Sequence, residues 1–485
     1  MNSDRRILLV ALVALASTAC LNRQGTEPPA FPGGGLLARS VPPPVWQAAP
    51  SGTPYESMVP VLSALEGVYA ASARFGNPVV VHTALTGNVD DRLQATLALF
   101  SAEHDAFALL SPGCLVDTSG ETPRTLLVLE GYWRFLEYPE PTAKETGLIR
   151  LYVEPQSAGE ALCRGEAIEP GTASLSGATG FGNSGPTAPV ELTYTRARKS
   201  RLVQGVRSFG VGVHHGACQT TDNCGVSENT AETFVLAKQL GGDYLEIDVR
   251  LTKDGIPVLF HLGLSPAVTQ GLYCVGGIED WTYDQLLANC RLRNGEIIPR
   301  LVDALEYGLT HTDMTVWLDM KVAEAVLPSS TIIGELNDRL VACEPGVPAP
   351  AGKRCLFPGS KSVVERVVIG LPSDDIINAY TTAKSAGELT PGQRCLCEEN
   401  FDAVVSIPCD AASPRYTRGP LASDAESLQS QGKFFGYWTI NDPKTIDAFL
   451  VAGRPNGILT NYLGTLNVRW EAVGVLPPYP LGVTP

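Results

Sequence analysis

The chain has 485 residues, of which 44% are hydrophobic and 18% charged, and it carries a formal net charge of −15 at pH 7. At roughly 150 residues per domain, this length excludes a single small module and predicts about three domains, or one large barrel with a smaller partner. The apolar fraction excludes a largely disordered chain, and the negative charge argues against a general affinity for nucleic acid.

Residues 1–20 have the three parts of a secretory signal peptide: two arginines, the apolar run Ile7–Ala16 and a small-residue stretch that ends at Cys20. The run is too short to span a bilayer comfortably. Cys20 resembles the lipid-modified cysteine of bacterial lipoproteins, and Leu21 resembles the next residue of lipoproteins sorted to the outer membrane. We expect an exported lipoprotein that faces the periplasm or the cell surface. A soluble periplasmic or secreted protein is the alternative.

Residues 21–55 are rich in proline and glycine, which predicts a tether. From 56 to 195, short β-rich runs alternate with turn clusters, and this pattern predicts a smaller β-rich domain, a sandwich or a barrel, of unknown role. A basic stretch without acidic residues follows. Its cations are Arg196, Arg198, Lys199, Arg201 and Arg207. We interpret it as a solvated linker, and contact with anionic lipid headgroups is the alternative.

Strand-like and helix-like segments alternate over residues 205–466, which predicts βα units and a parallel sheet. The expected strands are Ser208–His214, Tyr244–Val249, Pro257–His261, Thr315–Met320, Arg366–Leu371, Ala403–Ile407, Phe434–Ile440 and Gly457–Thr460. Eight strands in about 260 residues match a (β/α)8 TIM barrel. The predicted fold class is therefore α/β, a TIM barrel preceded by a smaller β-rich domain and followed by a C-terminal tail, 467–485.

The twelve cysteines fit export, because disulfides persist in oxidising compartments. Eleven remain without Cys20, enough for five disulfides and one spare thiol. Neighbours in sequence favour pairing Cys114 with Cys163, Cys218 with Cys224, Cys274 with Cys290, and Cys343 with Cys355. Among Cys395, Cys397 and Cys409, one is left over.

Several chemically active side chains fall at the ends of expected barrel strands, where the chemistry of such barrels takes place. They are His214, His215, Glu246, Asp248, His261, Asp319 and Lys321. Residues two apart on a strand point to the same face, so Glu246 and Asp248 aim at one point, as do Asp319 and Lys321.

Three converging carboxylates raise one another's pKa, a cost that a shared divalent cation removes. Oxygen ligands favour Ca²⁺ or Mg²⁺ over zinc, and such an ion neutralises a phosphoryl oxygen. Two histidines beside it can serve as general acid and general base, because imidazole titrates near neutral pH.

The same residues belong to an ordered set of motifs. The set comprises Val213-His214-His215-Gly216, Glu228-Asn229-Thr230, Glu246–Val258, His261, Ile298–Leu301, Trp317–Lys321, Trp438–Asn441 and Gly457–Thr460. Together, over roughly half of the chain, these motifs resemble the glycerophosphodiester phosphodiesterase family. The resemblance implies a TIM barrel that hydrolyses a phosphodiester to glycerol phosphate and an alcohol with the help of a divalent cation.

The resemblance also implies roles for single residues. These are catalysis for His214 and His261, metal binding for Glu246, Asp248 and Asp319, and substrate binding for His215, Lys321 and Trp438. A supporting role for His215 and core packing for Trp438 are the alternatives. The expected partners are a small-molecule or lipid-derived phosphodiester and, through Cys20, a membrane.

Four positions depart from the family pattern. His215 replaces an arginine that grips the phosphate, Leu262 and Asn461 each replace an aspartate, and Asp319 stands where a glutamate is usual. Asp at the last position resembles the spider-venom sphingomyelinase D branch, so a phospholipase D-like lipid phosphodiesterase is an alternative. A catalytically inactive barrel that binds phosphodiesters or a partner is another.

Overall fold

The computed structural model describes residues 62–72, 76–87, 93–101, 106–117, 123–135, 146–180, 185–203, 207–216, 226–271, 273–344, 347–398 and 409–473. Four expected features lie outside these ranges: the signal peptide with Cys20, the tether 21–55, the pair Cys218 and Cys224, and the strand Ala403–Ile407. Residues 467–472, expected in the tail, belong instead to the last helix. Within the described ranges, no helix has both the length and the apolar character that crossing a bilayer requires.

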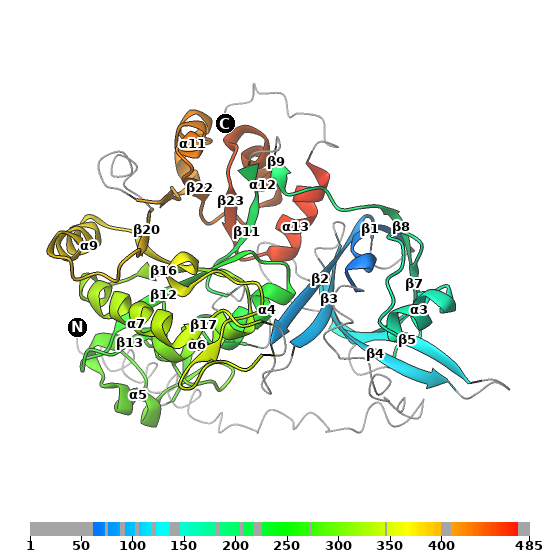
Figure 1. The fold of residues 1–485 in the computed structure, drawn as a ribbon, viewed down its shortest axis with the longest axis horizontal. Coiled ribbons are helices and arrows are strands. Elements are labelled where there is room, and N and C mark those ends of the chain that lie inside the picture. The colour runs from blue at the N-terminus through cyan, green and yellow to red at the C-terminus, as the bar shows by residue number, and fades with distance from the viewer. Residues whose placement is uncertain are drawn as a thin grey trace, which may run out of the picture.

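Eight antiparallel strands form a closed barrel in the N-terminal part of the chain, drawn in blue to teal in Figure 1. They are β1 (Gly67–Ala71), β2 (Val79–Gly87), β3 (Leu93–Ser101), β4 (Ala106–Asp117), β5 (Arg124–Phe135), β6 (Thr146–Glu154), β7 (Ser174–Thr179) and β8 (Ala188–Arg196). Each strand pairs with the next, and β8 returns to pair with β1. The helix α3 (Gln156–Cys163) connects β6 to β7. A closed barrel is one of the two architectures expected for residues 56–195.

Eight parallel strands form a second closed barrel. They are β11 (Gly210–Val213), β12 (Tyr244–Leu251), β16 (Thr315–Met320), β19 (Val367–Leu371), β20 (Arg394–Cys397), β21 (Ala411–Ala412), β22 (Phe434–Tyr437) and β23 (Gly457–Thr460). The sheet closes because β11 pairs in parallel with both β12 and β23. Among the described residues, the α-helices of this part are α4 (Glu232–Gln239), α5 (Tyr283–Asn289), α6 (Leu301–His311), α7 (Val326–Arg339), α8 (Val363–Arg366), α9 (Asp374–Ala386), α11 (Ala422–Ser430), α12 (Pro443–Ala448) and α13 (Leu463–Ala472). This is the (β/α)8 arrangement that the alternation predicts.

The prediction that Pro257–His261 forms a strand of the parallel barrel is wrong. Its described strand, β13 (Pro257–Leu259), pairs antiparallel with β12 at the outside of the barrel sheet. Only five residues separate Leu251 from Pro257, too few for the crossover that joins parallel strands. Gly255, with φ +78°, makes the tight turn of this hairpin. The short strands β20 and β21, which the sequence pattern did not reveal, complete the eight instead.

The two barrels share one hydrophobic cluster, which explains why β2 is buried on both faces. Val79 and Val81 point into the antiparallel barrel, whereas Val80 points outward into the cluster of the α/β barrel. Ala98 and Phe100 of β3 do the same. Figure 1 shows β2 and β3 facing the helices α4 and α13, with which they are in contact. Period-two alternation thus gives these strands two apolar faces.

Three cations of the basic stretch lie in this same interface: Arg196 at the end of β8, and Arg198 and Arg201 beyond it. Their ion pairs differ from the solvated linker expected from the sequence. Arg196 Nη1 and Arg198 Nε donate to the Glu471 carboxylate at 2.9 and 3.2 Å, and Glu471 is buried. Arg198 Nη2 donates to Asn467 Oδ1 at 3.0 Å, and Arg201 pairs with Asp243. Arg196, Arg198 and Arg201 are therefore held in ion pairs within the protein, although Arg196 stays partly exposed. Their acidic partners lie far away in sequence, so composition alone could not reveal them.

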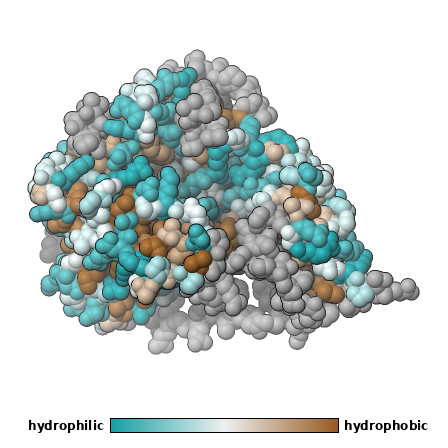
Figure 2. Space-filling view, in the orientation of Figure 1, coloured by the Kyte–Doolittle hydropathy of each residue, from teal (hydrophilic) through white to brown (hydrophobic). Residues whose placement is uncertain are grey.

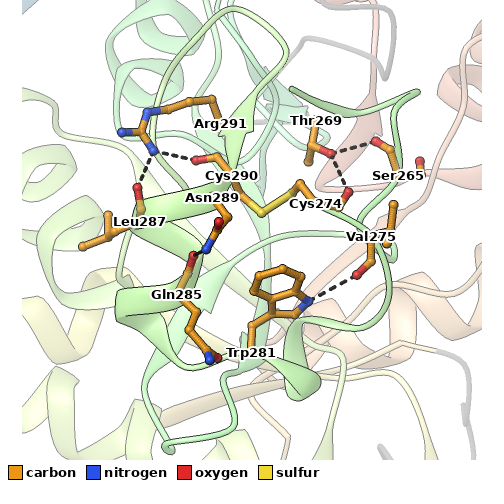
Figure 3. The surroundings of a disulfide bond; sticks show 10 residues. All are labelled: Ser265, Thr269, Cys274, Val275, Trp281, Gln285, Leu287, Asn289, Cys290 and Arg291. Atoms are coloured by element: carbon orange, nitrogen blue, oxygen red, sulfur yellow. Dashed lines mark hydrogen bonds between the residues drawn. A yellow bond between two sulfur atoms is a disulfide. The ribbon is translucent and has the colours of Figure 1, made fainter. Parts of the chain in front are cut away.

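Four disulfides occur among the described cysteines. They join Cys114 to Cys163, Cys274 to Cys290, Cys343 to Cys355 and Cys397 to Cys409, and Cys395 is a buried cysteine outside these disulfides. Three expected pairs and the left-over cysteine are confirmed. Figure 3 shows the bond between Cys274 and Cys290, beside which the Trp281 indole donates to the Val275 carbonyl at 3.2 Å. The bond closes the segment that follows His261.

Candidate active site

Three buried carboxylates converge at the carboxyl ends of β12 and β16. Glu246 and Asp248 are two residues apart on β12 and therefore point to the same face. The parallel register places Asp319 of β16 directly beside Asp248. One oxygen from each of Glu246, Asp248 and Asp319 lies within 4.8 Å of the other two. At most 9% of each residue is exposed. The period-two prediction for these acids therefore matches their geometry.

The carboxylate oxygens are incompletely satisfied, which is the pattern expected of a cation site. Glu246 Oε1 and Asp319 Oδ1 are buried and have no hydrogen-bond partner among the described residues. Burial, and then the charge of Asp248, raises the pKa of Glu246 to about 8. Burial likewise raises the pKa of Asp319 to about 6 although Lys321 opposes it. An all-oxygen donor set with orphaned buried oxygens fits a hard divalent cation.

Lys321 lies against the acids. Its Nζ is 2.7 Å from Asp248 Oδ1 and also contacts Asp319 Oδ2. Burial favours its neutral form, but Asp248 and Asp319 outweigh burial and raise the pKa of Lys321. Together with His215, Lys321 lowers the pKa of Asp248 against the effect of burial. Lys321 thus neutralises part of the negative charge and leaves Glu246 without a lysine partner.

Three imidazoles form a row above the acids, with His215 in the middle. The His214 and His215 ring centroids are 3.6 Å apart, and those of His215 and His261 are 4.2 Å apart. His215 Nε2 lies 3.2 Å from Asp248 Oδ2, and its Nδ1 lies 3.5 Å from Glu228 Oε2. Burial would lower the pKa of His215, but Asp248, Glu246 and Glu228 raise it to about 10. His215 therefore carries a positive charge at neutral pH.

The outer two histidines are neutral. Burial, and then the charge of His215, lowers the pKa of His214 well below its usual value. Burial lowers the pKa of His261 to about 4 although Asp248 opposes it. His214 Nδ1 lies 2.7 Å from Asn461 Oδ1, so the asparagine that departs from the family pattern orients this ring. Both rings are thus free to accept a proton.

The sequence analysis assigned no role to two residues of the site, Asn229 and Glu398. Asn229 donates to Asp248 Oδ2 at 2.7 Å and accepts from the Asp248 backbone N–H at 2.8 Å. Glu398, which follows β20, is buried and accepts from the Trp317 indole at 2.9 Å. Burial, and then Asp319, raises the pKa of Glu398 well above its usual value. Glu398 lies at the carboxyl end of a barrel strand, where functional residues are expected, but the sequence analysis did not predict β20.

Trp438, which was expected to bind substrate, and Leu262, which departs from the family pattern, are not part of the cluster of acids, histidines and Lys321. Trp438 follows β22, packs on the barrel core and stacks with Arg415, whose Cζ is 4.6 Å from the ring centroid. No ring contact, ion pair or hydrogen bond between Trp438 and the seven acidic, histidine and lysine candidates occurs in the described part of the chain. Leu262, which replaces an aspartate, is 48% exposed next to His261. Cys20 lies outside the described residues.

The α/β barrel part of the chain matches known proteins in sequence. Residues 214–327 match the model of the glycerophosphoryl diester phosphodiesterase family. The chain is 25% identical over 226 residues to "Probable glycerophosphodiester phosphodiesterase 2" of Mycobacterium tuberculosis, which covers 46% of this chain and 77% of that protein. It is 36% identical over 102 residues to glycerophosphodiester phosphodiesterase 1 of Homo sapiens, which covers 19% of this chain and 30% of the human protein.

A solved structure also aligns with the chain. The crystal structure of a glycerophosphodiester phosphodiesterase from Parabacteroides distasonis covers 54% of this chain and 97% of its own, at 16% identity and a TM-score of 0.41. The chain spans less than a third of the human relative's length. The β-rich barrel lies outside the stretch that the family model matches.

Proposed function

We propose that this protein is a metal-dependent glycerophosphodiester phosphodiesterase, which hydrolyses a glycerophosphodiester to glycerol phosphate and an alcohol. One observation carries the proposal: three buried carboxylates with orphaned oxygens lie beside a row of three imidazoles at the carboxyl ends of barrel strands. The names of the relatives matched in sequence support the same reaction.

Glu246, Asp248 and Asp319 would hold a divalent cation, Ca²⁺ or Mg²⁺, because their donors are oxygens. Bound there, the cation would supply positive charge to a phosphoryl oxygen. The imidazolium of His215 adds a further cation where the family has arginine. Lys321 keeps Asp248 and Asp319 together in the absence of substrate.

His214 is the proposed general base. The Asn461 Oδ1 atom accepts from Nδ1–H of His214, which leaves the Nε2 lone pair to take a proton from the attacking water as the water oxygen bonds to phosphorus. His261 is the proposed general acid. The anionic diester beside it favours its protonated form, and that proton goes to the alcohol oxygen as the bond from phosphorus to this oxygen breaks.

A lipid-derived diester is the second candidate substrate, and an exposed apolar surface favours it. Leu262 directly follows His261 and is 48% exposed, and Tyr273 and Val275 of the neighbouring disulfide segment are 75% and 50% exposed. An acyl chain could cover such a surface. Lysophosphatidylcholine and glycerophosphocholine as parallel substrates distinguish the two candidates.

We also propose that the protein is exported and lipid-anchored at Cys20. The disulfides support an oxidising compartment. Mass spectrometry of the mature N-terminus tests this proposal, since a diacylglyceryl group on Cys20 supports it and an unmodified N-terminus upstream of Cys20 contradicts it.

The test of the reaction is choline release from glycerophosphocholine by the wild type and two variants. We expect His214→Ala and His261→Ala each to lower kcat by at least about 100-fold, the usual value of acid–base catalysis, with unchanged circular dichroism. His311→Ala is the matched control, because this buried histidine stacks on Tyr307 away from the site. Wild-type turnover in the His214 and His261 variants would contradict the roles, and no turnover with any diester would leave only the binding-protein alternative.

A further inference from the structure

The opposite end of the α/β barrel holds a large cavity that the proposed reaction does not use. Its volume is about 930 Å³, within the range of small-molecule sites. Residues at the amino ends of the barrel strands line it, among them Gly210 of β11, Tyr244 of β12, Thr315 of β16 and Arg394 of β20. Catalysis in such barrels takes place at the other end.

An apolar plug separates this cavity from the acidic site. Trp317, Val368, Leu396, Ala411 and Leu459 form a buried cluster inside the barrel. Tyr244, Glu246 and Asp248 point the same way from β12, so Tyr244 and Asp248 are about 13 Å apart at roughly 3.3 Å per residue. None of the three carboxylates lines the cavity, so a ligand held at its rim does not contact them.

The rim of the cavity is cationic, although the whole chain carries a net charge of −15. Its cations are Arg201, Lys361, Arg394, Lys433 and Arg454, and its acids are Asp243 and Glu426. Arg201 pairs with Asp243, and Arg454 pairs with Glu426. No described carboxylate lies within ion-pair distance of Arg394, Lys361 or Lys433. Glu365 is the nearby acid that interacts with two of them: hydrogen bonds from Ser362 and then the charges of Lys361 and Arg394 lower its pKa. The rim still carries more cations than acids.

Helix termini explain only part of this charge. Lys433 follows the carboxyl end of α11, where a cation favours the helix dipole. Arg394 instead opens a strand, and Lys361 precedes the amino end of α8, where the dipole disfavours a cation. Convergence of like charges on a cavity costs free energy that a bound anion removes.

The floor of the cavity is aromatic. Tyr244 and Phe434 line it and contact each other edge to face, with centroids 5.5 Å apart and planes at 79°. The Tyr244 ring lies over Gly212 and Gly457, where a Cβ would come within 2.6 Å of it. These glycines therefore hold Tyr244 at the barrel mouth, where a flat apolar group can pack on it.

We propose that this cavity is a second ligand site, which binds a small organic phosphate that carries a flat apolar group. The cationic rim binds the phosphate, and the guanidinium of Arg394 is its bidentate partner. The flat apolar group packs on the floor formed by Tyr244 and Phe434. This proposal does not depend on the proposed hydrolysis, so an experiment can contradict one of the two proposals and leave the other standing.

The test uses phenyl phosphate, inorganic phosphate and phenol as probes on the full chain at low salt. Acetylation footprinting by mass spectrometry reports the reaction rate of each lysine. We expect phenyl phosphate to slow the acetylation of Lys361 and Lys433 several-fold and to leave Lys384, an exposed lysine of α9, unchanged. Inorganic phosphate protects less, and phenol does not protect. Equal rates with and without phenyl phosphate at Lys361 and Lys433 would overturn the proposal.

Charge reversal gives a second readout by calorimetry. We expect Lys433→Glu to weaken phenyl phosphate binding about fivefold, whereas the matched reversal Lys384→Glu changes the affinity less than twofold. Choline release from glycerophosphocholine stays at the wild-type level in both variants. Equal loss of affinity in the two variants would assign the binding to the overall charge of the protein and overturn the site.

Discussion

Asn229 shows how a single amide can organise a cluster of charges. It has φ +58°, a left-handed conformation that asparagine tolerates, and from there it bonds both the carboxylate and the backbone of Asp248. It thereby fixes which oxygen of Asp248 faces Lys321 and which faces His215. Residues that orient metal ligands contribute to affinity without touching the ion.

We therefore expect Asn229→Ala to weaken Ca²⁺ or Mg²⁺ binding by about 10- to 100-fold, the usual cost of losing a residue that orients a ligand. Titration calorimetry of the chelator-treated protein measures this affinity. Asn289→Ala is the matched control, since the Asn289 side chain donates to the Gln285 carbonyl within α5. An affinity of Asn229→Ala equal to that of the control would remove Asn229 from the metal site.

Part of the site was predictable at this scale. Alternation on a strand fixes the direction of Glu246 and Asp248 from the sequence alone, and the motif set adds His214 and His261. The position of His215 between the two other rings was not predictable. It depends on the left-handed backbone of His215 itself, with φ +51°, and on contacts with Glu228 and Asp248 from two separate segments. Asn461 and Glu398 depend on contacts with chain more than 80 residues away.

At the scale of elements, the connection between β8 and α13 joins the two barrels. Glu471 of α13 is 1% exposed and accepts hydrogen bonds from Arg196, Arg198 and the Lys199 backbone. A buried ion pair that loses one partner leaves a buried charge uncompensated, which is costly. Glu471 thus carries the ion pairs to Arg196 and Arg198 that help to join the two barrels.

We expect Glu471→Ala to lower the free energy of unfolding by about 3–5 kcal/mol, as measured by urea denaturation. Glu166→Ala, which removes an exposed partner of Arg164, serves as the control and leaves the midpoint unchanged. Indistinguishable midpoints for the two variants would contradict a structural role for the connection.

Element prediction succeeded where local signals decide and failed where distant ones do. Barrel strands β12, β16 and β23, in which apolar residues and motif residues stand together, were expected at the right places. The two-residue strand β21 carries no pattern that a sequence could reveal, and the hairpin β12–β13 was misassigned although the Asp254-Gly255 turn indicates it. The basic stretch was misinterpreted because Asp243 and Glu471 become its neighbours only in the fold.

At the scale of the whole molecule, the charges are segregated along the α/β barrel. Carboxylates gather at the carboxyl ends of the strands and cations at the amino ends, with the apolar plug between them. Figure 2 shows one outer face, on which hydrophobic residues lie in small groups among hydrophilic ones. The α/β barrel also makes an apolar contact inside the molecule, with β2 and β3.

The α/β barrel should therefore not be stable without its partner. We expect residues 205–473 alone to aggregate or to melt at a lower temperature than residues 62–473, because α4 and α13 lose the cover of Val80, Ala98 and Phe100 and Glu471 loses Arg196 and Arg198. Size-exclusion chromatography and thermal denaturation compare the two fragments. A monomeric shorter fragment with the same melting temperature would show that the barrels are independent.

The central claim is that Glu246, Asp248 and Asp319 hold the cation on which phosphodiester hydrolysis depends. The most direct measurement is choline release from glycerophosphocholine by chelator-treated protein before and after Ca²⁺ or Mg²⁺ is restored, with Glu246→Gln alongside. We predict no release without the cation, recovery on its return in the wild type, and no recovery in Glu246→Gln. Full activity in excess chelator, or full recovery by Glu246→Gln, would contradict the claim.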